Sequence, residues 1–184
     1  MNDMHSTPHL TGTYELDPAH STVAFAIGHM SLSTFRASFG DVEARLVADA
    51  GRLELEGRTR ADSISIAEPS ELREHVLDGD DFLHADEHPE LSFRSTAVDL
   101  RETGGVTVTG VLALRGIGRE VTLEGRLNGP IADPFGGERV ALELRATVDR
   151  RAWEMTWQNA MPDGADAVGW DVELSADLEL VKAA

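Results

Sequence analysis

The run Asp17-Pro-Ala-His20-Ser21 brings together the three residue types of a nucleophilic triad. No Gly-x-Ser-x-Gly elbow surrounds Ser21, and Asp-Pro and Ser are ordinary turn residues. A turn with a hydrogen-bonded structural histidine is therefore the favoured interpretation. A small enzyme that acts on a hydrophobic substrate, using His20 or His29 with Asp17, is kept as an alternative.

A second run places His84 and His88 four residues apart, with acidic residues between them. This spacing suits a metal ion when the segment is helical. Pro89 favours a loop instead, so we expect no functional metal site, and we expect a chelator to leave the stability unchanged. The chain has 0 cysteines, which excludes disulfides, thiolate metal sites and cysteine nucleophiles. No cofactor is expected.

The elements that must position these residues show a period of two, which sends alternate side chains to opposite faces of a strand. The pattern is clearest at the C-terminus, where Val172, Leu174 and Ala176 alternate with acidic residues and serine. Apolar residues on one face and charged residues on the other indicate antiparallel strands with one wet face. We expect strands over residues 13–16, 22–30, 39–48, 52–61, 91–98, 106–114, 120–127, 140–148 and 171–180.

The alternation stops twice. After Pro69, residues 70–77 followed by Gly79 predict one short helix, with Leu72, Val76 and Leu77 toward the sheet. Residues 151–169 are rich in Trp and Met and are expected to form a long ordered connection. We see no linker and expect one domain over residues 12–184, preceded by a disordered or loosely attached tail over residues 1–11.

Charge and composition exclude several classes of protein. The 33 Asp and Glu residues outnumber 16 Lys and Arg, and the net charge of -17 disfavours binding to nucleic acid. A hydrophobic content of 41% argues against general disorder, and no stretch is apolar and long enough to span a membrane. The first ten residues lack the features of a secretory signal, so a cytoplasmic protein is expected.

The apolar faces of the strands require a common interior. Closing the sheet buries them and removes unpaired edges, so we expect an all-β fold, a closed antiparallel barrel of about eight strands with one short helix packed against it. Small residues recur on the inner face, among them Gly57, Gly110, Gly125 and Ala176. Small inner residues favour a cavity, although glycines also mark bulges, and both interpretations stay open.

A cavity of this kind would be apolar and would suit an apolar ligand. His29 shares the alternation of its strand and could donate a hydrogen bond to a ligand head group, with a structural core histidine as the alternative. The tryptophans could equally be core anchors. The expected wall residues are Val23, Phe25, Ile27, Leu55, Phe93, Leu112, Leu142, Trp153, Trp157 and Trp170.

Several motifs occur in an order that resembles a known family. They are Tyr14-Glu-Leu-Asp17-Pro-Ala-His20-Ser21-Thr-Val-Ala-Phe25, His29-Met30, the segment from Arg73 to Phe82, His88-Pro89-Glu-Leu-Ser-Phe93-Arg-Ser95, Val108-Thr-Gly110-Val-Leu112, Gly118-Arg-Glu-Val121-Thr-Leu123 and the segment from Asp149-Arg150 to Trp157. Together they resemble the YceI-like family of lipocalin-like barrels, associated with polyisoprenoid and other amphiphile binding. The resemblance covers nearly the whole chain.

The chain departs from the family pattern at three places that bear on the pocket. Ser33-Thr34-Phe35-Arg36 stands where Gly-x-Phe is common, Leu83 stands where an aromatic residue is common, and Trp153-Glu154 replaces an aromatic residue followed by glycine. Family members often carry a signal peptide, and its absence here implies an intracellular version.

The resemblance implies a barrel that binds and sequesters or carries a long apolar or amphiphilic molecule, such as a polyisoprenoid, an isoprenoid quinone or a fatty-acid-like chain. No catalysis is expected, and a homodimer is allowed. Two alternatives stay open: a small enzyme acting on a hydrophobic substrate, and a filled barrel acting as a structural or interaction module.

Overall fold

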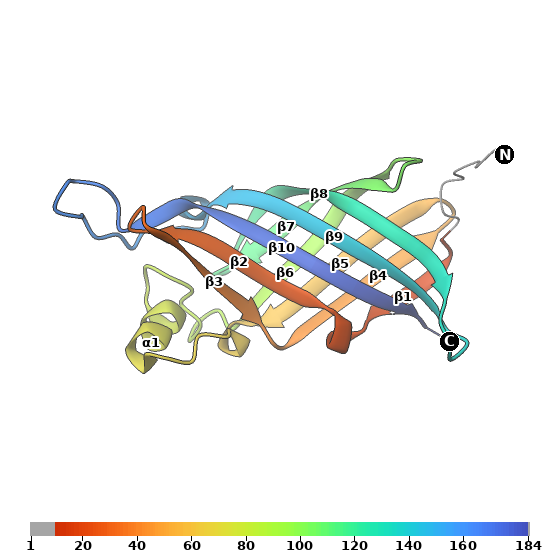
Figure 1. The fold of residues 1–184 in the computed structure, drawn as a ribbon, viewed down its shortest axis with the longest axis horizontal. Helices are drawn as coiled ribbons and strands as arrows, with labels where there is room; N and C mark the ends of the chain where they lie inside the picture. The colour runs from red at the N-terminus through yellow and green to blue at the C-terminus, as the bar shows by residue number, and fades with distance from the viewer. Residues whose placement is uncertain (1–9, 184) are drawn as a thin grey trace.

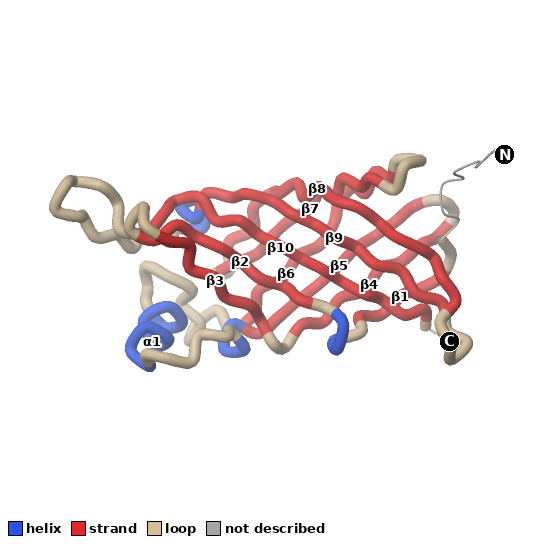
Figure 2. Tube along the Cα trace, viewed as in Figure 1, coloured by secondary structure: helices blue, strands red, loops and turns tan. Residues whose placement is uncertain are grey.

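The computed structural model describes residues 10–183 as a single antiparallel sheet with one α-helix (Figures 1 and 2). The strands are β1 (Gly12–Leu16), β2 (Thr22–His29), β3 (Ser33–Phe39), β4 (Val42–Asp49), β5 (Arg52–Arg60), β6 (Glu90–Leu100), β7 (Gly105–Leu114), β8 (Ile117–Ala132), β9 (Glu138–Asp149) and β10 (Val168–Lys182). The helix is α1 (Ser70–Asp78), and short 3-10 helices are η1 (Pro18–His20), η2 (Ala61–Ser63) and η3 (Arg150–Trp153).

Eight strands close the sheet into a barrel. The order runs β1-β4-β5-β6-β7-β8-β9-β10, and β10 pairs again with β1. Strands β2 and β3 are additional and extend the sheet from β10. The prediction of a closed antiparallel barrel of about eight strands with one short helix is therefore confirmed. The tail expected over residues 1–11 falls mostly on residues 1–9, outside the described residues, while Leu10 is buried against the core.

Strand β10 changes its partner near its C-terminal end, between Asp177 and Leu180. Its C-terminal end pairs with β1, with Leu180 opposite Leu16, whereas its remainder pairs with β2, beginning with Asp177 opposite Thr22. Helix η1 lies between these two pairings. The Ser21 hydroxyl accepts a hydrogen bond from the backbone N–H of Glu179 at 2.9 Å. The motif around Asp17 and Ser21 thus occupies the point where the barrel exchanges one strand for another.

Strand β3 was missed in the sequence because the turn before it contains no Gly, Asn, Asp or Pro. Met30 and Ser31 both have positive φ, at 54° and 52°, where hairpin turns usually contain Gly, Asn or Asp. The alternation of Phe35 and Phe39 with polar residues is present but short. The strand expected over residues 39–48 is accordingly two strands, the end of β3 and β4.

The connection between β5 and β6 runs along the otherwise free edge of β3. Phe39 forms an isolated bridge with Ile64, and the backbone N–H of Ser65 donates to the carbonyl of Ser38 at 2.8 Å. Helix α1 follows, as predicted, with Pro69 as its N-cap and Gly79 as its C-cap. Its Leu77 is buried in a cluster with residues of β3 and η2, so α1 covers the side that β3 leaves open.

The core occupies the end of the barrel closed by β1. Its fully buried side chains include Tyr14, Leu46, Leu142, Leu180, Val106 and Val108. The hydroxyl of Tyr14 donates to the Glu138 carboxylate at 2.5 Å, so its one polar atom is satisfied at the edge of the core. Among the described residues, no helix has the length and apolar content needed to cross a membrane.

Two glycines on the inner face of the barrel, Gly57 and Gly110, have different surroundings. Gly57 borders open space, and a Cβ there would meet only ordinary contacts, the nearest at 3.4 Å. A Cβ on Gly110 would lie 2.5 Å from the Phe93 ring and 2.8 Å from the Ser95 backbone, where β6 carries a bulge. Of the two interpretations left open for these glycines, the structure favours a bulge site over a cavity wall for Gly110, because its missing side chain lets β6 approach closely.

Candidate ligand-binding cavity

A cavity of about 640 Å³ lies inside the barrel at the end covered by α1. Its wall is almost wholly apolar and comes from strands β2 to β10, from α1 and the connection after it, and from η3 and the connection that follows η3. Each strand contributes the side chains of its inward parity, for example Val172, Leu174 and Ala176 of β10. The cavity is therefore the space between inward-pointing side chains that do not reach one another across the barrel.

The cavity ends at a floor of packed side chains, and its position can be located on individual strands. Leu144 and Leu178 border the cavity, whereas Leu142 and Leu180, two residues farther toward the β1 end, belong to the core and do not reach it. Ala44 and Leu46 of β4 differ in the same way. A ligand in this space therefore meets a packed floor, and the cavity is a blind tunnel.

Three aromatic rings form part of the cap. Phe82 stacks on Trp157, with ring centroids 5.6 Å apart, and His75 of α1 meets both rings edge-on at 5.0 and 5.6 Å. The backbone N–H of Trp157 donates to the carbonyl of Asp81 at 3.2 Å. The long connection after η3 is thus joined to the segment after α1, and the joint borders the cavity.

Arg150 is the most buried charged group at the cavity wall, with 2% of its surface exposed. Its guanidinium donates to the carbonyls of Gly169, Met155 and Trp157 at 2.6–2.9 Å. Burial lowers the pKa of this guanidinium. The ring of Trp170 lies 4.2 Å from the guanidinium carbon. The side chain holds the connection from Met155 to Trp157 against the start of β10.

Eight of the eleven predicted site residues border the cavity. They are Val23, Phe25, Ile27, His29, Leu55, Phe93, Leu112 and Trp157. Their shared position follows from the parity seen in the sequence, and whether they contact a ligand stays a prediction.

The other three lie elsewhere. Leu142 belongs to the packed core below the floor. Trp153 is 2% exposed, and its indole N–H donates to the carbonyl of Leu112, so it is a core anchor. Trp170 donates to Asp166 and packs on Arg150 because a register shift between Val168 and Val172 breaks the parity that pointed it inward.

Sequence reasoning missed other residues that border the cavity. Phe35 was missed with strand β3, and Phe39 was placed at the start of the strand expected over residues 39–48 without being chosen, although the alternation of the two was a usable signal. Val172 and Leu174 were placed on the inner face without being chosen. Phe82 carries no pattern that marks it, since it lies in a turn and reaches the cavity only through the fold.

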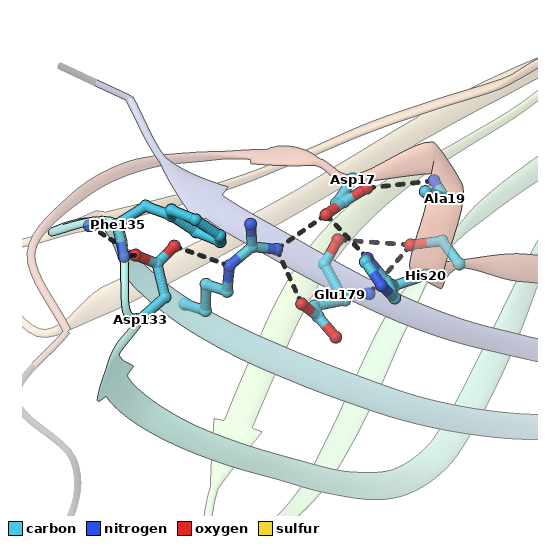
Figure 3. A network of polar contacts seen from close by, with 9 residues as sticks. Asp17, Ala19, His20, Asp133, Phe135 and Glu179 are labelled. Atoms are coloured by element: carbon cyan, nitrogen blue, oxygen red, sulfur yellow. Dashed lines mark hydrogen bonds and ion pairs between the residues drawn. The ribbon is translucent and has the colours of Figure 1, made fainter.

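The run Asp17 to Ser21 forms a polar network on the outside of the barrel (Figure 3). Arg139 donates to Asp17 and Glu179 at 2.7 Å and to Asp133 at 2.8 Å. The Arg139 guanidinium, followed by His20, lowers the pKa of Asp17 to about 2, and Asp17 in turn raises the pKa of His20.

This network does not form a triad. The His20 ring pairs with Asp17 at 3.0 Å, while the Ser21 hydroxyl is engaged with the backbone of Glu179. His29 lies at the opposite end of β2, so it is not brought to Asp17 either. The arrangement fixes the start of β2 and has no nucleophile paired with a base.

Comparison with known proteins agrees with this architecture. The UPF0312 protein SA2479 of Staphylococcus aureus strain N315 is 26% identical over 168 residues, which cover 90% of this chain and 95% of the relative. The crystal structure of Burkholderia cenocepacia BcnA has a TM-score of 0.72 at 18% identity and covers 89% of this chain and 98% of its own.

A polyisoprenoid binding domain from Saccharophagus degradans, implicated in plant cell wall breakdown, has a TM-score of 0.63 at 12% identity and covers 92% of this chain and 98% of its own. At these identities the solved structures show that the fold is shared. The model of the YceI-like domain matches residues 14–180, from the buried Tyr14 in β1 to the buried Leu180 in β10. With nearly every barrel strand inside that match, the chain belongs to the YceI-like domain family.

Proposed function

We propose that this chain binds one long apolar or amphiphilic molecule in the cavity and sequesters or carries it. The observation that carries the proposal is the apolar cavity of about 640 Å³, closed by a packed floor at one end and capped by α1 at the other. The family and the polyisoprenoid binding domain from Saccharophagus degradans support a lipid-like ligand.

The volume limits the length of the ligand. A methylene group is about the size of a water molecule, whose share of liquid volume is about 30 Å³, so 640 Å³ holds about 20 carbon atoms. An isoprenoid of about four units fits, whereas a longer chain must leave part of itself outside. Each buried square ångström of apolar surface contributes about 25 cal/mol before the costs of ordering, so few polar contacts are needed.

The tail of the ligand would lie toward Leu144 and Leu178 at the floor, and its polar end would lie near the cap. The wall residues are then Val23, Phe25, Ile27, Leu55, Phe93, Leu112 and Trp157, and His29 is the proposed donor to the head group. A cytoplasmic location and a homodimer stay predictions from the sequence.

We favour carriage over catalysis because, among the described residues, no hydrogen bond joins a serine to a histidine, and the Asp17 network lies outside the cavity. The volume of the cavity also disfavours the filled-barrel alternative.

The test is to identify what occupies the cavity. The protein is purified from two different hosts, denatured and extracted with organic solvent, and the extract is analysed by mass spectrometry. We expect a lipid of about one equivalent per chain, and we expect the emptied and refolded protein to bind geranylgeraniol. Extracts that contain only buffer components, together with no uptake of geranylgeraniol, would overturn the proposal.

A further inference from the structure

Three potential metal ligands gather in the connection between α1 and β6. The imidazole nitrogens of His84 and His88 and a carboxylate oxygen of Glu87 all lie within 4.8 Å of one another. The sequence favoured a loop here, but the backbone N–H groups of Glu87 and His88 both donate to the carbonyl of His84, at 3.2 and 3.0 Å. This turn places two residues four apart on the same side, as a two-histidine site requires, with His84 itself at a positive φ of 53°.

Packing orients both rings. His88 lies against the turn between β7 and β8, where a Cβ on Gly116 would be 2.9 Å from its Cε1 atom. The ring of His84 meets that of His88 edge-on, with centroids 5.8 Å apart. Within residues 10–183 neither ring has a hydrogen-bonded side-chain partner, and the ion pair of Glu87 is with His84 at 3.7 Å. Two imidazoles and a carboxylate thus face one another with their lone pairs available.

A second cluster of the same kind provides a contrast. Asp17, His20 and Glu179 also place their ligand atoms within 4.8 Å. Both of those carboxylates, however, already accept hydrogen bonds from Arg139 at 2.7 Å. A cation is therefore already present there, and a metal ion would be repelled by the guanidinium. Glu87 has no Arg or Lys partner among the described residues.

We propose that His84, Glu87 and His88 form a binding site for a divalent transition-metal ion, with Zn²⁺ the best match to two imidazoles and one carboxylate. Three protein ligands leave a fourth position for water. The Glu87 side chain is 69% exposed, so it can rotate to close the ligand distances.

The site would act on the cap of the cavity. Leu83, next to His84, borders the cavity, and β6 begins two residues after His88. A bound ion would fix both ends of this turn and so hold the segment between α1 and β6 in place. This inference does not depend on the identity of the ligand in the cavity.

The test is a calorimetric titration with zinc chloride. Because His5 and His9 lie in the N-terminal segment, the reference is the full chain with both replaced by alanine. We expect one Zn²⁺ per chain for this reference. His84→Ala and His88→Ala should each lower the affinity at least tenfold, and Glu87→Gln should lower it less, because an amide oxygen remains.

The matched control is His20→Ala in the second cluster, which should leave zinc binding unchanged. Circular dichroism confirms that each variant is folded, and nitrogen-15 spectra of the imidazoles should show zinc-dependent shifts for the two signals lost in His84→Ala and His88→Ala. Unchanged binding in those two variants, its loss in His20→Ala, or absence of zinc binding to the reference would each overturn the proposal.

Discussion

The two ends of the barrel share most of their strands but differ in their interiors. At the β1 end, Tyr14, Leu46 and Leu180 are no more than 1% exposed and belong to one packed core cluster. At the α1 end, inner residues such as Val172 and Leu174 face a cavity. Both ends show the same alternation of apolar and polar residues, so alternation alone does not decide whether a barrel is filled.

The difference follows from the partner change of β10. At the β1 end, eight strands close the ring directly, and eight strands enclose just enough space for side chains to fill. At the α1 end, β2 and β3 replace β1, so nine of the ten strands surround the interior. The ring is wider there and is completed by α1 and its flanking connections. A wider ring keeps opposite side chains apart and leaves the cavity.

The largest expected effect is on stability, when one leucine is truncated at each end of the barrel. Leu142→Ala removes a fully packed side chain, and such changes cost about 2 to 5 kcal/mol. Leu174→Ala should cost clearly less, because Leu174 already borders open space. Thermal unfolding of both variants measures the difference. Equal losses of stability would show that the α1 end is packed as tightly as the β1 end.

A matched pair of glycines sharpens the comparison. Gly110→Ala forces a methyl group against Phe93 and the β6 backbone, and overpacking of this kind costs about 1 to 3 kcal/mol. Gly57→Ala adds the same methyl group beside the cavity, where its nearest contact is 3.4 Å, so stability should change little. Urea unfolding of the two variants tests this, and the opposite ranking would contradict the assignment of the two glycines.

Filling the cavity should abolish most of the proposed binding. Ala176 borders the cavity between Val23 and Leu144, so Ala176→Trp should lower the affinity for geranylgeraniol at least tenfold, or about 1.4 kcal/mol. Thr147→Trp places the same ring on the exposed outer face of β9 and serves as the control. Affinities come from a fluorescence displacement titration. An undiminished affinity in Ala176→Trp would place the ligand outside this cavity.

The Asp17 network should make the junction between the two ends sensitive to acid. The pKa of Asp17 falls from 3.8 to about 2 on folding, chiefly through Arg139. A lowered pKa stabilises the fold above the unfolded value, and this contribution is lost as the pH falls from 3.8 toward 2. The melting temperature should therefore drop over this range, and Asp17→Asn should drop less steeply. If the melting temperatures of the unchanged protein and of Asp17→Asn fell in parallel with pH, Asp17 would not be the cause of the acid sensitivity.

The smallest expected effect is spectroscopic. Trp157 borders the cavity, whereas Trp153 is a core anchor, so the fluorescence change on ligand binding should come mainly from Trp157. Trp157→Phe should keep an aromatic wall, change the affinity by less than tenfold and remove most of the signal. Trp153→Phe should keep the signal. A ligand-dependent change that survives in Trp157→Phe would contradict the position of the ligand under the cap.

The sequence predicted most of the wall because parity is a local property. Val23, Phe25 and Ile27 were placed together correctly, since no irregularity interrupts that part of β2. Trp170 was misplaced because the register shift between Val168 and Val172 interrupts the alternation at that position. Phe35 was missed together with β3. In the turn before β3, Met30 and Ser31 have positive φ, a conformation that these residue types do not predict.

By itself, the sequence determined the all-β fold, nine of the ten strands, the helix after Pro69 and the apolar character of the interior. Each of these depends on neighbouring residues, through alternation, capping and turn chemistry. Only the tertiary structure decided which end is hollow, why Gly57 and Gly110 differ, and that His84 and His88 share one side of a turn. The hollow end depends on β10, which exchanges β1 for β2. The glycines differ in how closely a neighbouring strand approaches, and the two histidines share a turn that packs against Gly116.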